Sequence, residues 1–143
     1  MSQTYERPFT VKDEHVDFQG IVDGLYYPFY MEDCRHQYIK DVLGIDLHGD
    51  AAAGVNWVLS QSLVKFRRSL TKGDQFSATC SAHPDKSGRP VVHFRQTIVR
   101  GGKLVTEGLF TATCVKAAGG RSYLPAEVTE KLASAEPVES PDW

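Results

Sequence analysis

The sequence lacks any excess of positive charge. Its 16 Lys and Arg residues against 18 Asp and Glu residues give a formal net charge of −2. A nucleic-acid-binding protein needs a basic face that neutralises phosphates, so we expect no nucleic-acid partner. Apolar residues make up 41% of the chain and charged residues 24%, which is typical of a folded domain and not of a disordered one. With 143 residues, the chain is expected to form one domain over residues 1–143.

Long apolar runs are also missing, since no stretch approaches the roughly 20 residues of a membrane span. The first residues, MSQTYERPF, have no basic head followed by an apolar stretch, so we expect no secretory signal. Cys34, Cys80 and Cys114 cannot all pair within the chain, and none stands in a Cys-x-x-Cys spacing. We therefore expect three reduced, buried thiols in a cytoplasmic protein without a membrane partner.

Metal-ligand spacings and glycine-rich phosphate loops are absent too. His48, His83 and His93 show no ligand spacing. His15 and Asp17 would supply two ligands, but no third is evident. We therefore predict no metal site.

One segment has the periodicity of a helix. Over residues 25–43, apolar side chains recur at steps of three and four and form one stripe. The stripe consists of Tyr27, Tyr30, Met31, Cys34, Tyr38 and Val42. Charged residues such as Arg35 are expected to lie off it. Because Pro28 belongs in a first turn, the helix either begins at residues 26–28 or begins at Asp23 and is distorted at Pro28.

The other segments have strand patterns. An opening strand is expected over residues 8–16, and residues 48–54 are expected to form a polar loop. Four further runs are predicted to be strands: residues 55–66, 76–82, 92–98 and 103–115. Their short, turn-like connections predict antiparallel neighbours, hence a four-strand meander.

From about residue 117 the chain is expected to be peripheral. A short helix is predicted over residues 126–135, and residues 136–143 are expected to be flexible. The upstream elements indicate an α+β fold, because the helix must bury its one apolar stripe against the antiparallel sheet. The sheet would have to curl around the helix.

The densest cluster of unusual residues lies between the opening strand and the helix. It comprises His15, Asp17, Gly20, Asp23, Gly24, Tyr26 and Tyr27. A helix N-terminus carries unsatisfied backbone N–H groups and can bind a developing oxyanion. A carboxylate several residues upstream can face the same point as a base or nucleophile. From these residues alone, however, Asp17 can equally be a turn former and Asp23 a helix cap.

The cluster resembles the signature of a known family. DFQGIV at residues 17–22, continued by YPFYMEDCR at residues 27–35, resembles the hotdog-fold acyl-CoA thioesterases, and in particular their 4-hydroxybenzoyl-CoA thioesterase-like branch. The segments 62–70 and 121–128 resemble the same branch, so that about residues 7–130 are covered. The resemblance implies a curved antiparallel sheet wrapped around one long central helix.

The resemblance also implies an activity, namely hydrolysis of an acyl-CoA thioester to a free acid and coenzyme A. Asp17 stands where the family carries its essential carboxylate, as nucleophile or general base. Backbone N–H groups around Asp23 and Gly24 would polarise the carbonyl oxygen. No metal or redox cofactor is implied, because coenzyme A enters only as part of the substrate. The family forms homodimers or homotetramers with sites between subunits.

Substrate contacts are expected from three further residues: Tyr27, and Arg67 and Arg89 as candidate partners of the coenzyme A phosphates. The chain departs from the family at His15, where an acid is common, and at Asp23 and Gly24, where Tyr followed by His or an aromatic residue is common. A third departure is Tyr26, where the family usually carries Asn. The backbone role survives these departures, since any residue except proline supplies an N–H. The alternatives are a non-catalytic acyl-CoA or small-ligand binding protein on the same scaffold, and a cystatin-like helix-on-sheet domain.

Overall fold

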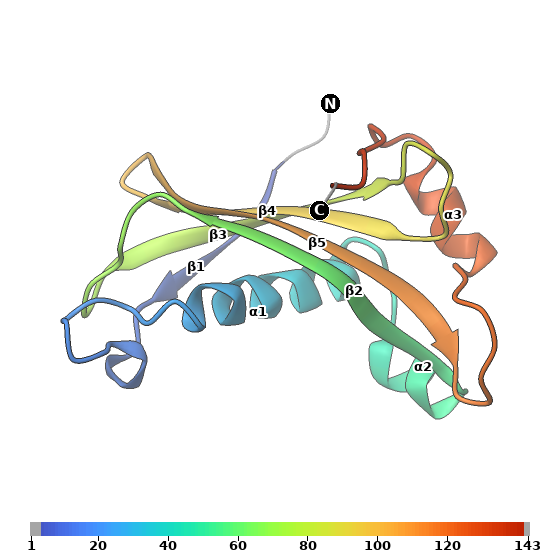
Figure 1. Ribbon diagram of the computed structural model, residues 1–143, viewed down its shortest axis with the longest axis horizontal. Coiled ribbons are helices and arrows are strands. Elements are labelled where there is room, and N and C mark those ends of the chain that lie inside the picture. The colour runs from blue at the N-terminus through green and yellow to red at the C-terminus, as the bar shows by residue number, and fades with distance from the viewer. Residues whose placement is uncertain (1–3, 142–143) are drawn as a thin grey trace.

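Five strands form one antiparallel sheet in the order β1-β3-β4-β5-β2 (Figure 1). The computed structural model describes residues 4–141. The strands are β1 (Tyr5–Thr10), β2 (Val55–Phe66), β3 (Gln75–Pro84), β4 (Val92–Arg100) and β5 (Lys103–Lys116). The helices are α1 (Tyr26–Asp41), α2 (Leu47–Ala52) and α3 (Ala126–Leu132), and a short 3₁₀ helix, η1 (Asp13–His15), precedes α1. Within residues 4–141, no helix is long and apolar enough to cross a membrane.

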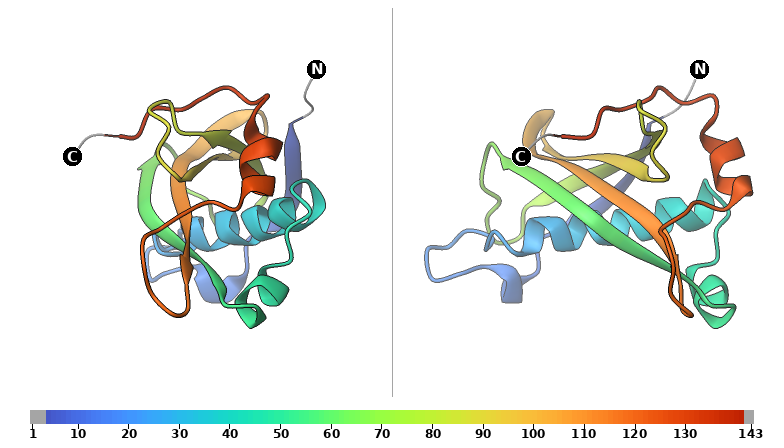
Figure 2. Two further views of the ribbon diagram at one scale, coloured as in Figure 1. Left: turned by 90° about the vertical axis from the view of Figure 1, so that its right-hand side faces the viewer. Right: turned by 45° about the vertical axis from the view of Figure 1, so that its right-hand side comes forward.

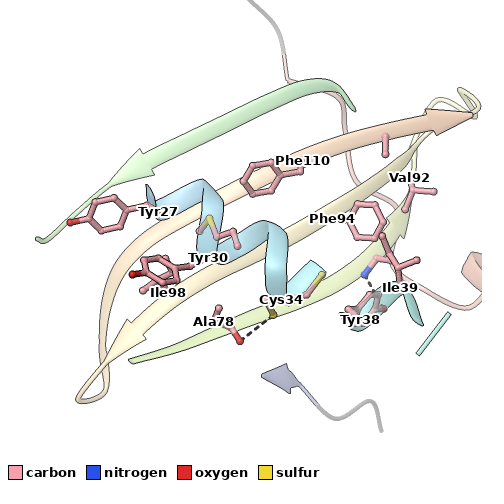
Figure 3. Close-up of a cluster of buried hydrophobic side chains, with 14 of the residues drawn as sticks. Tyr27, Tyr30, Cys34, Tyr38, Ile39, Ala78, Val92, Phe94, Ile98 and Phe110 are labelled. Atoms are coloured by element: carbon pink, nitrogen blue, oxygen red, sulfur yellow. Dashed lines mark hydrogen bonds between the residues drawn. The ribbon is translucent and has the colours of Figure 1, made fainter. Parts of the chain in front are cut away.

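The central helix α1 packs against one face of the sheet, which curves around it (Figures 1 and 2). This arrangement confirms the predicted α+β class. The helix begins at Tyr26 with Pro28 in its first turn, where the missing N–H of proline costs nothing. Its apolar side chains interlock with those of β3, β4 and β5, as Figure 3 shows for Cys34, Phe94 and Phe110.

Three tyrosines of α1 also anchor the helix through their hydroxyl groups. Tyr27 Oη accepts a hydrogen bond from the Leu70 N–H at 3.0 Å, and Tyr38 Oη accepts one from the Ala82 N–H at 3.1 Å. Tyr30 Oη accepts one from the Lys12 N–H at 3.1 Å. Each bond satisfies a backbone donor that would otherwise lack a partner, so the helix is fixed in register against three other segments.

The buried face of α1 is wider than predicted. Arg35 was expected to lie off the apolar stripe, but its side chain is buried. It continues the row Tyr27, Met31, Arg35, Ile39, in which side chains four residues apart lie one above another. A curved sheet covers more of a helix than a flat one, so this second row is buried as well. Val42, predicted to belong to the stripe, is exposed beyond the last turn.

The predicted four-strand meander is wrong for β2. The strands β3, β4 and β5 do form a meander, but β2 pairs with β5, joining Trp57 to Cys114 and Phe66 to Thr106. The free edge of β3 is taken by β1. The segment 67–74 therefore crosses the end of the sheet, and β2 becomes an edge strand.

Two local predictions before β2 are also corrected. The first strand ends at Thr10, and residues 13–15 form η1, because the chain leaves the sheet after the Val11 N–H bonds to Asp74 O at 2.9 Å. The expected polar loop at residues 48–54 contains most of α2, whose first turn is capped by Asp46.

The end of the described chain is held on the outer face of the sheet. Val138 is buried and pairs with Asp85, and its N–H donates to Pro84 O at 2.9 Å. Ser140 Oγ donates to Asp85 Oδ1 at 2.7 Å. The prediction of a flexible segment 136–143 therefore does not describe residues 136–140, while residues 142–143 lie outside the described residues. The short helix predicted over residues 126–135 is confirmed as α3, which ends earlier, at Leu132.

Candidate active site

The turn that carries Asp17 is a narrow hairpin between η1 and α1. Val16 and Val22 form an antiparallel bridge, and the Asp17 N–H donates to Ile21 O at 2.8 Å. The turn closes with the Gly20 N–H donating to Asp17 O at 3.0 Å, and Gly20 has a φ of 83° that only glycine adopts readily. The sequence Asp-x-x-Gly therefore fixes Asp17 at the first position of a tight turn.

The hairpin carries two partly buried aspartates, Asp17 and Asp23, next to its paired valines. Val22 is buried and Val16 packs against the core. The Asp23 N–H donates to His15 O at 2.9 Å, so Asp23 lies across the hairpin from His15. Asp17 follows His15 by two residues, which separates the two aspartates by roughly 7 Å along the hairpin.

The Asp17 carboxylate is oriented by its own turn. Its Oδ1 accepts from the Gln19 N–H at 2.8 Å, and its Oδ2 accepts from Gln19 Nε2 at 3.3 Å. The side chain is half-buried, and within residues 4–141 it forms no ion pair. The carboxylate therefore keeps lone pairs free for a water or a substrate carbon.

Some of the backbone N–H groups at the start of α1 already donate hydrogen bonds within the protein. Asp23 Oδ1 accepts from the Leu25 N–H at 3.0 Å, and Asp23 O accepts from the Tyr26 N–H at 2.9 Å. The Asp23 side chain thus acts as a cap. Within the described chain the Gly24 N–H has no acceptor, and a Cβ at Gly24 would meet nothing within 4 Å. The Gly24 N–H is therefore a backbone donor without a protein acceptor at the junction between the hairpin and α1.

His15 joins this hairpin to the helix. Its ring stacks on Tyr26, with centroids 4.0 Å apart, and its Nδ1 lies 2.6 Å from Tyr30 Oη. The side chain is buried. His15 therefore does not pair with Asp17. It holds the hairpin against the first turns of α1.

The remaining predicted site residues lie apart from one another. Tyr27 is buried with its ring edge on Phe66, 5.5 Å between centroids, and its hydroxyl is used by Leu70. Arg67 follows β2 at the end of the sheet that holds the hairpin, and its Nη2 lies 3.2 Å from Glu107 Oε1. Arg89 lies beyond the other end of the ten-residue strand β3, roughly 30 Å away at about 3.3 Å per residue, and donates to Ser140 Oγ at 2.8 Å.

Large apolar side chains are exposed around the hairpin and along β2. Phe18 is 97% exposed and Leu25 79%. On the edge strand the exposed apolar residues are Val58, Leu59, Leu63 and Phe66. The four exposed apolar side chains of β2 lie on a strand whose outer edge is unpaired within the described residues, which is a feature typical of strands that pair with another chain.

A cavity of about 520 Å³ lies between α1, α2 and β2. Arg35, Glu32 and His36 supply its charged or titratable groups. The sequence analysis missed Arg35, although the row of every fourth residue, Tyr27, Met31, Arg35 and Ile39, was readable from the sequence. Within residues 4–141, no group of three His, Cys, Asp or Glu side chains could hold a metal ion.

Comparison with known proteins gives a consistent picture. A family model described as the thioesterase-like superfamily matches residues 11–138. The chain is 30% identical over 76 residues to the chloroplastic acyl-acyl carrier protein thioesterase ATL3 of Arabidopsis thaliana; the match spans 53% of this chain and 40% of that protein.

Two solved structures are similar in fold. A 1,4-dihydroxy-2-naphthoyl-CoA thioesterase from Synechocystis superposes with a TM-score of 0.81 at 12% identity, covering 93% of this chain and 98% of the other. A hypothetical protein from Staphylococcus aureus, solved in complex with CoA, has a TM-score of 0.81 at 16% identity, covering 98% and 90%.

Proposed function

The chain belongs to the thioesterase-like superfamily and has its hotdog fold, and on that basis we propose that it hydrolyses acyl-CoA thioesters to free acid and coenzyme A. The observation that carries the proposal is the junction between the hairpin and α1, which holds both a carboxylate with free lone pairs and a backbone donor without a protein acceptor. The S. aureus neighbour solved with CoA supports a CoA-linked substrate.

Two routes are compatible with this geometry. In the first, an Asp17 oxygen attacks the thioester carbon, the C–S bond breaks, coenzyme A leaves as a thiolate, and water hydrolyses the resulting anhydride. In the second, Asp17 takes a proton from a water whose oxygen attacks the same carbon, the C–S bond then breaks, and coenzyme A leaves as a thiolate that is protonated by solvent. In both, the Gly24 N–H donates to the carbonyl oxygen as its negative charge develops. A thiol with a pKa near 8.5 leaves readily without a strong general acid.

We propose that Arg67 binds the phosphates of coenzyme A at the Asp17 site of its own chain, and that Arg89 of that chain does not. Arg67 lies at the end of the sheet that carries the Asp17 hairpin, and its side chain is 47% exposed. Arg89 lies at the opposite end, so it could serve this site only from a second copy. Tyr27 then acts on the substrate indirectly, because its buried hydroxyl fixes α1.

We also propose that two copies pair through β2. This strand has a free edge and exposes apolar side chains. A two-fold axis pairs β2 with itself in antiparallel fashion. The Phe66 end, beside the start of α1, then lies next to the Val55 end of the partner copy. A homotetramer is the other assembly that the family resemblance predicts. The cytoplasm stays the expected compartment, supported by three free, buried cysteines.

A thiol-release assay with a panel of acyl-CoAs tests the proposal. We expect turnover of at least one acyl-CoA without added metal or redox cofactor. Because the Arabidopsis relative is an acyl-acyl carrier protein thioesterase, the panel includes acyl groups on both carriers. Tight binding of acyl-CoA with no thiol release from either carrier would instead support the non-catalytic binding protein.

A further inference from the structure

Arg35 carries a buried charge that the chemistry at Asp17 does not use. Its side chain is 4% exposed, its Nη1 donates to Gln96 Oε1 at 2.9 Å, and its guanidinium carbon lies 4.6 Å from the centre of the Phe110 ring. Within residues 4–141, no carboxylate lies within 4 Å of it. Burial lowers the pKa of Arg35 from its usual value. A buried guanidinium without an anion is costly unless a ligand completes its hydrogen bonds.

The cavity beside Arg35 suits an elongated, mostly apolar group. Its apolar lining comes mainly from Ile39, Leu47, Trp57, Val58, Leu59 and Phe94. Arg35 lines the same cavity, and one protein hydrogen bond leaves most of its five N–H donors available. The cavity therefore combines an apolar wall with a cationic donor.

We propose that this cavity binds the distal part of the acyl group and that Arg35 binds a carboxylate at its end. The substrate class is then the CoA thioesters of dicarboxylic acids with an apolar body. The inference rests on the proposed thioesterase function and specifies the substrate of that same site.

The position of the cavity fits such a substrate. Arg35 lies nine residues after Tyr26, roughly 13 Å along α1 from the helix start at 1.5 Å per residue. In the proposed β2 dimer, the partner's hairpin would approach the Val55 end of β2, which borders the cavity. The carboxyl end of the acyl group could thus reach Arg35 while its thioester lies at a hairpin.

The carboxylate of Glu32 reduces the net positive charge of this cavity. Glu32 lines the cavity, but its carboxylate is 52% exposed and lies 3.7 Å from His36 Nε2, so solvent screens its charge. Arg35, by contrast, is desolvated, and charge-assisted hydrogen bonds strengthen in such surroundings. The net preference is therefore for an anionic oxygen.

The test compares matched substrates: octanedioyl-CoA, octanoyl-CoA and 8-hydroxyoctanoyl-CoA. We expect kcat/KM for octanedioyl-CoA to exceed that for octanoyl-CoA by about tenfold or more. Arg35→Gln should bring the ratio of the two kcat/KM values to about one, Arg35→Lys should retain part of the preference, and the exposed control Arg121→Gln should leave the ratio unchanged.

Equal kcat/KM for octanedioyl-CoA and octanoyl-CoA in the wild-type protein would overturn the inference and leave the thioesterase proposal standing. A preference for the hydroxyl substrate would overturn the carboxylate assignment. Since Arg35→Gln could fail to fold, binding of free octanedioate and octanoate to the wild-type protein gives a second test by calorimetry. Tighter binding of octanedioate supports the site even if no thioester is hydrolysed, and equal binding contradicts it.

Discussion

At the scale of single residues, the geometry of the site depends on hydrogen bonds within the hairpin and at the start of α1. Asp17 begins a turn closed by Gly20, and Asp23 caps the helix that follows. The family resemblance predicted the position of Asp17 and backbone donors around Asp23 and Gly24. The Asp23 N–H donates to His15 O, whereas the Gly24 N–H has no acceptor within residues 4–141.

The contact between His15 and Tyr30 yields a first prediction. His15→Phe keeps the ring that stacks on Tyr26 but loses the nitrogen beside Tyr30 Oη. We expect kcat to fall by about tenfold with a smaller change in KM, because a hairpin displaced by a fraction of an ångström misplaces Asp17.

Tyr30→Phe should cause a similar loss, and steady-state kinetics of the double variant should show that the two losses do not add. Additive effects, or a change confined to KM, would contradict a positioning role for His15.

The buried cluster around Asp85 yields a second prediction. Burial alone would raise the pKa of Asp85, but hydrogen bonds from His93, Ser140 and the backbone N–H groups of Arg89 and Ser87 outweigh it and lower the pKa to about 2. The carboxyl of the unfolded chain titrates near 3.8. The ionised Asp85 carboxylate therefore contributes fully to the free energy of unfolding above pH 3.8, and this contribution is lost as the pH falls toward 2.

In urea unfolding across this range, the loss of stability should be about 2 kcal/mol smaller for Asp85→Asn than for the wild type. The exposed Asp33→Asn serves as the control and should leave the pH profile unchanged. A profile for Asp85→Asn as steep as that of the wild type would contradict the assignment.

At the scale of elements, the fold follows from one helix whose buried face is wide and whose tyrosines reach the backbone of other segments. The helix and four strands were readable from periodicity. The position of β2 in the sheet was not readable in this way. The eight-residue connection 67–74 is long enough either to place β3 beside β2 or to cross the end of the sheet and leave β2 at the opposite edge. The helix α2 was missed because residues 47–52 have no apolar stripe, and only the cap at Asp46 marks its start.

The anchoring of α1 is tested by Tyr27→Phe. This change leaves the buried Leu70 N–H without an acceptor, so we expect the free energy of unfolding to fall by about 1–3 kcal/mol in urea titrations. Tyr26→Phe is the matched control, because the Tyr26 hydroxyl makes no hydrogen bond within residues 4–141. Equal destabilisation by both changes would rule out the anchoring role.

At the scale of the whole molecule, the site looks incomplete in one chain. The hairpin is flanked by exposed Phe18 and Leu25, and β2 exposes a row of apolar side chains at a free sheet edge. A two-fold pairing of β2 would cover this strand and bring a hairpin of one copy near the Arg35 cavity of the other. The sequence of one chain does not show this arrangement, because the proposed contacts would lie between two copies.

This assembly predicts that Leu59→Lys produces a monomer. Near the centre of a self-paired β2, the change would place two positive charges close together across the axis. Sedimentation velocity should show a wild-type dimer and a monomeric variant with reduced thioesterase activity. Val42→Lys, at a similarly exposed apolar position just after α1, should remain dimeric. A monomeric wild type, or dissociation by both variants, would contradict the pairing.

The most direct test is the kcat/KM of Asp17→Asn on the best acyl-CoA of the panel, measured beside Asp33→Asn. Asparagine keeps the acceptor for the Gln19 N–H but can neither attack the thioester nor take a proton from water. We expect a fall of about 10²–10⁴-fold with an unchanged unfolding midpoint, and wild-type activity for Asp33→Asn. A folded Asp17→Asn protein that hydrolyses the substrate as fast as the parent would refute the catalytic role of Asp17.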